Sequence, residues 1–158
     1  MVKKTYTEKL NNSGDLPKTE FIGFDNSMAK RFGCGNMLIA APIEYDEVMK
    51  RIPKGRIITS NEIRAYLAKK HDADFTCHLT AGIFINLAAN ASQESQNSES
   101  GEITPYWRTL KKGGELNPKY PGGIEHQRML LEMEGHIVIN KGKRYFVKDY
   151  ERALYELQ

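Results

Sequence analysis

Cysteine is scarce in this chain, and so are long apolar runs. The sequence of 158 residues contains two cysteines, Cys34 and Cys77, which are too few for a disulfide framework. Neither is spaced with histidines as a zinc site requires, so we expect no metal and no cofactor. No stretch approaches the roughly 18 apolar residues that a membrane helix needs. These absences argue against a disulfide-rich secreted module and a membrane protein, and we expect a cytoplasmic protein with reduced thiols.

A strong excess of one charge is also missing. The formal net charge is +3 and the sequence pI is about 8.8. Such a mildly basic balance allows a polyanionic partner but does not require one, because basic surfaces also serve solubility. With 40% hydrophobic and 27% charged residues, the composition is that of an ordinary soluble globular domain.

The first 41 residues show weak periodicity. A short helix is expected at Thr5 to Leu10 and a helical turn at Met28 to Phe32. Cys34 stands between two glycines, and no His or Asp is close to it in sequence, which favours a small residue in a tight turn over a nucleophile. We therefore expect residues 1–41 to be an N-terminal extension that packs on a domain formed by residues 42–158.

Helix signals become stronger from Pro42. This proline suits the first position of a helix that runs to Ile52, with acidic residues in its first turns. A short strand at Arg56 to Thr59 leads into a second helix, because Thr59 and Glu62 have the spacing of a reciprocal cap. This part of the chain is predicted to be a helix, a short turn and another helix.

A third helix is expected from Thr76 to Asn90, with Thr80 as its cap. The predicted core face consists of Ile83, Phe84, Leu87 and Ala88. The predicted outer face is small and uncharged, and consists of Ala81, Gly82, Ile85, Asn86 and Ala89. Such a face lets another helix or a nucleic acid come close to the backbone. The low-complexity segment 91–101 should follow as a mobile surface loop.

The C-terminal part begins with a stretch from Thr104 to Gly135 that concentrates aromatic residues, turns and a short amphipathic helix. After it, His136 to Ile139 and Arg144 to Val147 predict a β-hairpin, and Tyr150 to Leu157 predicts a terminal helix. Helices followed by a hairpin describe a winged-helix-like domain, so the expected fold is mainly α with a small β-hairpin. A fold with so many uses does not name a function.

Five motifs occur in one order along the chain. They are Pro53-Lys54-Gly55-Arg56-Ile57-Ile58-Thr59, Asn90, Pro105-Tyr106-Trp107-Arg108, Tyr120-Pro121-Gly122-Gly123 and Leu130-Leu131-Glu132-Met133-Glu134-Gly135. Over residues 43–139 they resemble the C-terminal domain of the alkylguanine-DNA (methylated-DNA-protein-cysteine) alkyltransferases. The resemblance implies a winged-helix-like domain that enters the minor groove and flips an alkylated guanine into a pocket. Members of that family transfer the alkyl group to their own cysteine.

The chain departs from the family at its active-site run, Pro-Cys-His-Arg. Tyr106 stands at the position of the acceptor cysteine, and Trp107 at that of the activating histidine. Because a phenol with a pKa of about 10 is a poor substitute for a thiolate, we expect no alkyl transfer and no enzyme activity. Glu134 matches the glutamate that orients the histidine and should remain as a structural acceptor. The pattern resembles the alkyltransferase-like proteins, which bind damaged DNA without repairing it; Cys77 as a relocated acceptor is the enzymatic alternative.

Two sets of candidate site residues follow. The expected pocket residues are Tyr106, Trp107, Arg108, Tyr120 and Glu134. The residues expected to contact double-stranded DNA, alkylated or not, are Thr59, Ser60, Thr80, Ala81, Gly82, Ile85, Asn86, Asn90, Lys111, Lys112, Lys141, Lys143 and Arg144. The alternative function is a protein-interaction or small-ligand module that uses the same aromatic residues as its pocket.

Some features of the sequence oppose the DNA interpretation. The family's phosphate-pressing tyrosine is Ser60 here, and its intercalating arginine has no counterpart at Thr80 or Ala81. The segment from His71 to Trp107 contains five acidic residues and no Lys or Arg, which is the wrong sign for phosphate contacts. The acidic segment favours the protein-interaction alternative, whereas the basic hairpin favours DNA.

Overall fold

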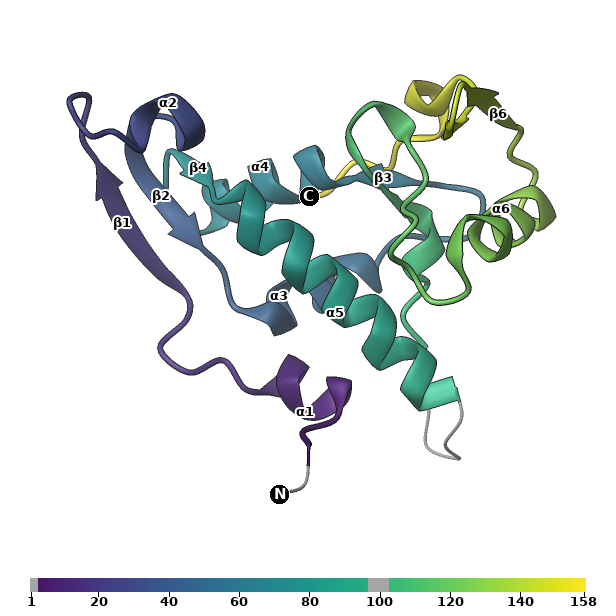
Figure 1. The fold of residues 1–158 in the computed structure, drawn as a ribbon, viewed down its shortest axis with the longest axis horizontal. Helices are drawn as coiled ribbons and strands as arrows, with labels where there is room; N and C mark the ends of the chain where they lie inside the picture. The colour runs from purple at the N-terminus through teal and green to yellow at the C-terminus, as the bar shows by residue number, and fades with distance from the viewer. Residues whose placement is uncertain (1–2, 97–102) are drawn as a thin grey trace.

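The computed structural model describes residues 3–96 and 103–158, which form helices and three small sheets (Figure 1). The α-helices are α1 (Tyr6–Asn11), α2 (Ala29–Phe32), α3 (Pro42–Met49), α4 (Ser60–Lys70), α5 (His78–Gln96) and α6 (Gly123–Met133). The strands are β1 (Lys18–Ile22), β2 (Gly35–Ile39), β3 (Ile58–Thr59), β4 (Phe75–Thr76), β5 (Thr109–Leu110), β6 (Val138–Lys141) and β7 (Arg144–Val147). Short 3₁₀ turns occur at Tyr106–Arg108, Lys112–Gly114 and Tyr150–Ala153. The fold is thus mainly helical with little sheet, as the sequence predicts.

Helix α5 is the element on which the others pack. It crosses the middle of the molecule, between the strands of the N-terminal part and the C-terminal segment with α6 (Figure 1). Helices α1 and α3 pack against it. Its buried face is a stripe of mostly small side chains: Ala81, Ile85, Ala88, Ala89 and Ser92. Small side chains let the neighbouring helix backbones approach closely, which makes this face the core side.

The prediction of which α5 residues are buried was right for Ala88 in the core and Gly82 outside it, and wrong for several others. Ile83, expected in the core, is 62% exposed, and Phe84 and Leu87 are only half-buried. Ala81 and Ile85, expected on the outer face, are 1% and 3% exposed. Phe84 still packs against the core, with its ring 6.0 Å from that of Tyr45 of α3, whereas Ile83 is left on the outside.

Both predicted ends of α5 also need correction. The helix begins at His78, so Thr80 lies inside its first turn, where its hydroxyl donates to the carbonyl of Cys77 at 3.5 Å. The helix continues to Gln96, and Ser92 is buried with its hydroxyl bonded to the backbone of Thr104. The expected surface loop is therefore helical up to residue 96, and its remainder lies outside the described residues.

The N-terminal part forms two strands that the sequence did not indicate. Strand β2 pairs with β1 in antiparallel and with β4 in parallel orientation, which gives a three-stranded sheet. Strand β1 shows no alternation of buried and exposed residues, because only Ile22 is buried. Strand β4 has two residues and is too short to show any pattern. The short helix and the helical turn expected in this part are confirmed as α1 and α2.

The start of α4 lies beside strand β5, in the stretch from Thr104 to Gly135. The Thr59–Glu62 cap is confirmed, because the Thr59 amide donates to Oε2 of Glu62 at 3.1 Å. Strand β3 pairs in parallel with β5, Ile58 opposite Thr109. This pairing brings the segment after Arg108 next to the first turn of α4.

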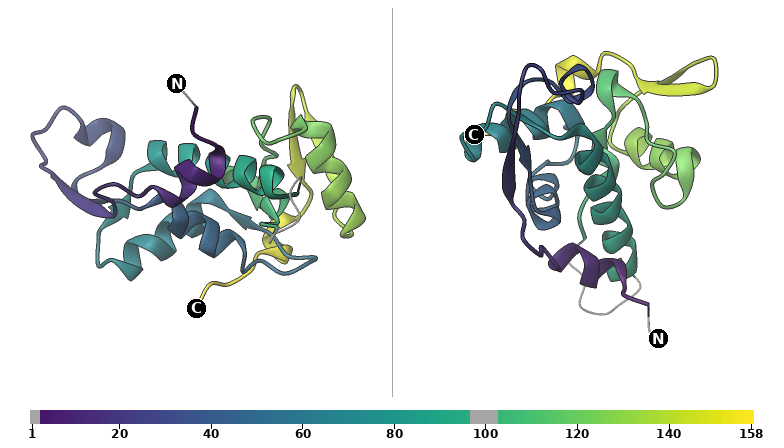
Figure 2. Two further views of the ribbon diagram at one scale, coloured as in Figure 1. Left: turned by 90° about the horizontal axis from the view of Figure 1, so that it is seen from below. Right: turned by 60° about the vertical axis from the view of Figure 1, so that its left-hand side comes forward.

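At the C-terminus the hairpin is confirmed as β6 and β7, but the terminal helix is wrong. Residues Tyr150–Ala153 form one 3₁₀ turn, after which the Tyr155 amide donates to the Ile57 carbonyl at 2.8 Å. Backbone pairing to Ile57 thus replaces helical hydrogen bonds. The chain end lies across the molecule from the N-terminal helix α1 (Figure 2). Within the described residues, no helix has the length and apolarity to cross a membrane.

Candidate nucleic-acid interface

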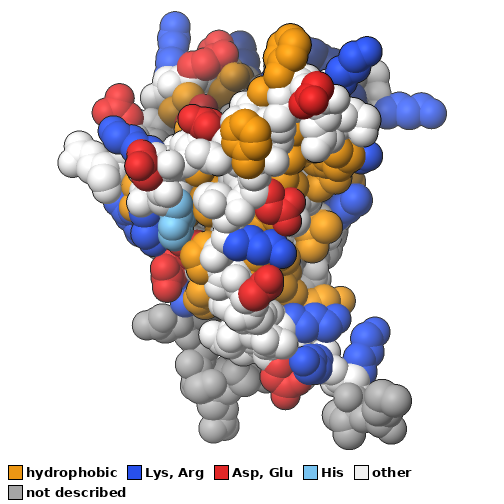
Figure 3. Space-filling view, turned by 90° about the vertical axis from the view of Figure 1, so that its left-hand side faces the viewer, with side chains coloured by type: hydrophobic (Ala, Val, Ile, Leu, Met, Phe, Trp, Pro, Cys, Tyr) orange, Lys and Arg blue, Asp and Glu red, His pale blue; other side chains and the backbone are white. Residues whose placement is uncertain are grey.

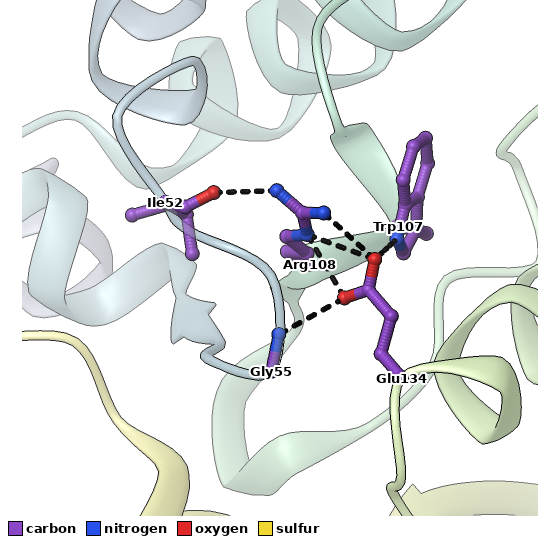
Figure 4. A network of polar contacts seen from close by, with 5 residues as sticks. All are labelled: Ile52, Gly55, Trp107, Arg108 and Glu134. Carbon is purple, nitrogen blue, oxygen red and sulfur yellow. Dashed lines mark hydrogen bonds and ion pairs between the residues drawn. The ribbon is translucent and has the colours of Figure 1, made fainter.

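Glu134, at the end of α6, accepts hydrogen bonds from three residues (Figure 4). Arg108 donates from Nε to Oε1 at 2.9 Å and from Nη2 to Oε2 at 2.7 Å. Trp107 donates from Nε1 at 3.0 Å and the Gly55 amide at 3.4 Å. Arg108 also donates from Nη1 to the Ile52 carbonyl at 2.7 Å. We call these five residues the Glu134 network; it ties α6 to the segment between α3 and β3.

The network holds Glu134 in its charged form. Burial alone would raise the pKa of this carboxyl group, but hydrogen bonds from Arg108, Trp107 and the Gly55 amide lower the pKa below its ordinary value. The side chains of Arg108 and Glu134 are 14% and 8% exposed. Glu134 is thus a largely buried carboxylate whose oxygens are occupied by hydrogen bonds within the chain.

The two tyrosines of the expected pocket lie in the core. Tyr106 is 1% and Tyr120 is 3% exposed, and their rings meet edge to face at 5.2 Å between centroids. The Tyr120 hydroxyl donates to the Thr109 carbonyl at 2.7 Å. Burial raises the pKa of Tyr106, which favours the protonated phenol. Tyr120, one of the five expected pocket residues, also lines an open groove.

That groove lies between α4, α5 and the segment after β5. Its volume is about 670 Å³. One wall is the start of α4, with Ser60, Asn61 and Arg64. The second wall is α5 from His78 to Asn86, and the third is the segment from Leu110 to Tyr120. We call this hollow the α5 groove; Ala81 and Ile85 form its buried floor.

The α5 groove is lined by cations without anions. Its basic residues are Arg64, Lys111, Lys112 and Lys119, and none of the described residues that line it is acidic. Arg64 is held in place, because its Nε donates to the Thr76 carbonyl at 3.2 Å and its Nη1 to Asn61 at 3.3 Å. Positive charge therefore lines two of its walls, α4 and the segment from Leu110 to Tyr120, as in a site that binds anions.

The acidic residues that count against DNA lie elsewhere. Glu94 accepts the Tyr6 and Thr7 amides at the start of α1, at 3.0 and 2.9 Å. Asp74 accepts the Asn36 amide at 2.8 Å and, with Asp72, lines a neighbouring hollow of about 710 Å³. The other two acidic residues of the segment lie outside the described residues. The three described acidic residues of the segment thus do not line the α5 groove, although the hollow lined by Asp72 and Asp74 shares Arg64 and Lys112 with it.

The structure brings together about half of the expected DNA-contacting residues. Those that line the α5 groove are Ser60, Ala81, Gly82, Ile85, Asn86, Lys111 and Lys112. Three others are not among the lining residues. Thr59, the N-cap residue of α4, is buried. Thr80 lies in the first turn of α5, and Asn90 donates to the Asn86 carbonyl at 2.9 Å.

Sequence reasoning missed groove residues on all three walls. They include Asn61, Arg64, His78, Leu79, Ile83, Asn117 and Lys119. Arg64 follows Ser60 by one helical turn, so its place on the same face of α4 could have been inferred. Ile83 and Leu79 could not, because their exposure depends on which face of α5 is covered.

The β6–β7 hairpin is joined to the third groove wall. Arg144 donates to Glu115 from Nη2 at 2.8 Å and from Nε at 3.1 Å, and Lys111 lies 3.9 Å from the same carboxylate. The hydrogen bond from Arg144 lowers the pKa of Glu115, so this pairing persists at neutral pH. Lys141 and Lys143 stand next to Arg144 on the hairpin, which we call the basic hairpin, and extend the cationic surface beyond the groove.

The face on the side of β1 and β2 is different. Cationic, anionic and hydrophobic side chains are interspersed over it (Figure 3). Phe21 and Phe24 of this part are 73% and 91% exposed. A surface of such mixed character shows no preference for a polyanion. Within the described residues, no group of three or more His, Cys, Asp or Glu side chains could hold a metal ion.

No family model and no curated protein matches the chain. Two solved structures of an S. pombe protein are similar to it. The crystal structure of Atl1 in complex with damaged DNA containing O6-carboxymethylguanine is 16% identical, with a TM-score of 0.45 over 73% of this chain and 94% of that chain. A structure of S. pombe ATL in complex with DNA is 15% identical, with a TM-score of 0.47 and the same coverage. The likeness is distant, so the function of this chain has to follow from its own groove and charges.

Proposed function

We propose that this chain is a non-enzymatic, alkyltransferase-like protein that binds double-stranded DNA in the α5 groove. The observation that carries the proposal is the lining of that groove, in which four basic residues stand with no acidic one among the described residues. Contacts to phosphate supply most of the affinity of proteins for DNA, and they come from Lys and Arg side chains.

The shape of the groove supports the same ligand. Gly82 is exposed on the α5 wall, with open space where a side chain would be. Arg64 and the lysines of the segment from Leu110 to Tyr120 stand on the two other walls. A duplex backbone that approached α5 would therefore find cations on either side of the helix.

The absence of alkyl transfer is part of the proposal. Tyr106 is buried, and its raised pKa keeps the phenol neutral. Cys77, the alternative acceptor, is 5% exposed and packs with Ile22 and Met37 in a small cluster under the three-stranded sheet. Neither group is placed to attack an alkylated base bound in the groove. Alkylated guanine in DNA remains the lesion that the sequence resemblance suggests.

A salt series tests the binding. The dissociation constant for a labelled duplex, with and without one O6-alkylguanine, is measured by fluorescence anisotropy between 50 and 400 mM salt. If all four groove cations touch phosphate, the logarithm of affinity should fall with the logarithm of salt with a slope of up to about −3.6. Tighter binding of the alkylated duplex would support lesion recognition. No binding of either duplex at 50 mM salt would contradict the DNA function.

Intact mass tests the chemistry independently. After incubation with the alkylated duplex, the mass of the protein should be unchanged. A stoichiometric adduct, lost in Cys77→Ala or Tyr106→Phe, would show that the chain is a transferase after all.

A further inference from the structure

The outer edge of strand β1 has no partner strand among the described residues. The strand lies at the margin of the molecule and pairs with β2 alone (Figure 1). Its first four residues are exposed. Phe21 is 73% exposed, and Phe24, in the turn that follows the strand, is 91% exposed. An uncovered edge strand with exposed apolar side chains is a place where another strand can add.

The register of the sheet shows which backbone groups of β1 are used. The carbonyls of Asn36 and Leu38 in β2 accept hydrogen bonds at 2.9 and 2.8 Å from the amides on either side of β4. These two residues therefore direct their backbone groups toward β4, and Met37, between them, directs its own toward β1. Met37 lies opposite Glu20. The backbone groups of Glu20 are thus bonded to β2.

Thr19 and Phe21 stand on either side of Glu20 and direct their N–H and C=O groups away from β2. Within the described residues, these backbone groups have no hydrogen-bond partner. The edge of β1 thus offers two donors and two acceptors in the arrangement that a further strand requires.

We propose that β1 pairs in antiparallel orientation with β1 of a second copy of this chain, which joins two three-stranded sheets into one of six strands. The pairing is centred on Thr19, which exchanges both backbone hydrogen bonds with Thr19 of the second copy. Phe21 of each copy then lies against the residues that precede β1 in the other. Such a contact is two-fold symmetric and uses the same patch on both copies.

Charge favours a second copy as the occupant and sets the register. The side chains of Lys18 and Glu20 lie on one face of β1, with 3.8 Å between Nζ and Oε1, and are 42% and 51% exposed. A pairing centred on Thr19 places Lys18 of each copy opposite Glu20 of the other, which forms two cross-strand ion pairs. A pairing centred on Glu20 would set two carboxylates against each other, which is destabilising.

The surrounding surface has the same self-complementary character. The face on the side of β1 and β2 carries side chains of both charges and apolar side chains in alternation (Figure 3). No residue of β1 is among the described residues that line the α5 groove. The dimer is therefore independent of the proposed DNA function, and the two are tested separately.

Sedimentation velocity at protein concentrations up to about 1 mM tests the association. The apparent mass of the parent should rise with concentration from 18.0 kDa toward twice that value. Thr19→Pro removes the donor at the centre of the free edge and leaves the hydrogen bonds to β2 in place, so this variant should remain monomeric. Thr19→Val keeps the N–H group and should associate as the parent does.

Charge reversal tests the choice of partner. Lys18→Glu and Glu20→Lys, each alone, should raise the dissociation constant of the dimer about tenfold, because like charges then lie opposite each other. An equimolar mixture of the two variants should associate as tightly as the parent, since the acidic strand of one faces the basic strand of the other. A mixture no tighter than its components would overturn the proposal.

Cross-linking tests the register, in a Cys34→Ser background that removes the exposed native thiol. With diamide as the oxidant, Thr19→Cys should form a disulfide between copies, because residues opposite each other at a hydrogen-bonded pair have Cα atoms about 5.5 Å apart. Phe21→Cys should not. A cross-link at position 21 in place of 19 would overturn the proposal. So would a parent that stays at 18.0 kDa throughout, or a Thr19→Pro protein that dimerises as the parent does.

Discussion

In the Glu134 network every charged group has a partner, whereas Lys112 and Lys119 in the α5 groove have no carboxylate partner among the described residues. The network uses the motif residues Trp107, Arg108 and Glu134, which carry the resemblance to a DNA-repair family. The α5 groove contains one residue of these motifs, Tyr120, and its basic residues belong to none of them. The motif residues Trp107, Arg108 and Glu134 thus hydrogen-bond to one another or to the backbone, and the basic groove lies beside them.

The difference has a physical basis. A carboxylate that accepts hydrogen bonds from Arg108, Trp107 and a backbone amide has little capacity left for a ligand. Ammonium groups that line a hollow and have no carboxylate partner gain the most electrostatic stabilisation when an anion binds. The two regions should therefore respond in opposite ways to mutation, salt and pH.

The largest effect is expected from breaking the network. Glu134→Ala would leave Arg108 buried and unpaired, so the free energy of unfolding should fall by about 3–5 kcal/mol. Urea denaturation measures it. Glu132→Ala is the matched control on the same helix, because the Arg128–Glu132 pair is exposed and should contribute only about 0.3–0.5 kcal/mol. Equal losses in the two variants would mean that the network contributes no more than a surface ion pair.

The second effect concerns the groove. Replacing Lys111, Lys112 and Lys119 together by alanine should reduce the magnitude of the salt slope by up to about 2.7, since each lost phosphate contact removes roughly 0.9. Stability should change little, because these side chains are at the surface. The same charge is removed from the N-terminal part in a Lys4, Lys9 and Lys18 triple variant, which should keep the slope of the parent. If the groove variant kept that slope too, the groove would not be the interface.

A smaller change is expected from the basic hairpin. Lys141→Ala with Lys143→Ala should reduce the slope by up to about 1.8. Arg144 is left in place because its loss would also free the carboxylate of Glu115, which it holds at 2.8 Å. A Lys141→Arg, Lys143→Arg protein keeps both charges and should match the parent. Loss of binding in that arginine variant would point to a shape requirement in place of charge.

The sequence predicts most helices of this fold because their ends carry local signals. Pro42 and the Thr59–Glu62 cap mark α3 and α4, and Gly142 marks the hairpin turn. Such signals depend on a few neighbouring residues and need no knowledge of the partner elements. The three-stranded sheet lacked them, because β4 has two residues and pairs with a strand nearly forty positions away.

The α5 faces show where local reasoning ends. Ala81, Ile85 and Ala89 form one possible core stripe, and Ile83, Phe84, Leu87 and Ala88 form another. Hydrophobicity favours the second stripe, yet every member of the first is buried and, of the second, only Ala88 is. The candidate site inherits this error, since Ile83 was assigned to the core and Arg64 and Lys119 were not considered. The lysines at positions 111 and 112 were found because charge is visible without a fold.

The smallest expected effect is the change in the free energy of unfolding that acid causes through the Glu134 network. Glu134 has a lowered pKa in the folded protein, so its contribution to stability is complete above the unfolded value of about 4.3 and is lost as the pH falls through the folded value. One such carboxyl group changes the free energy of unfolding by at most about 1.4 kcal/mol per pH unit in that window. Glu134→Gln should be less stable than the parent at pH 7, and the gap should narrow below pH 4.5, as urea denaturation across pH would show. Glu44 has a lowered pKa as well, so both proteins should still lose stability in acid. The α5 groove has no carboxylate among its described lining residues. A gap between parent and Glu134→Gln that stayed constant down to pH 3 would mean that Glu134 is not the titrating group of the network.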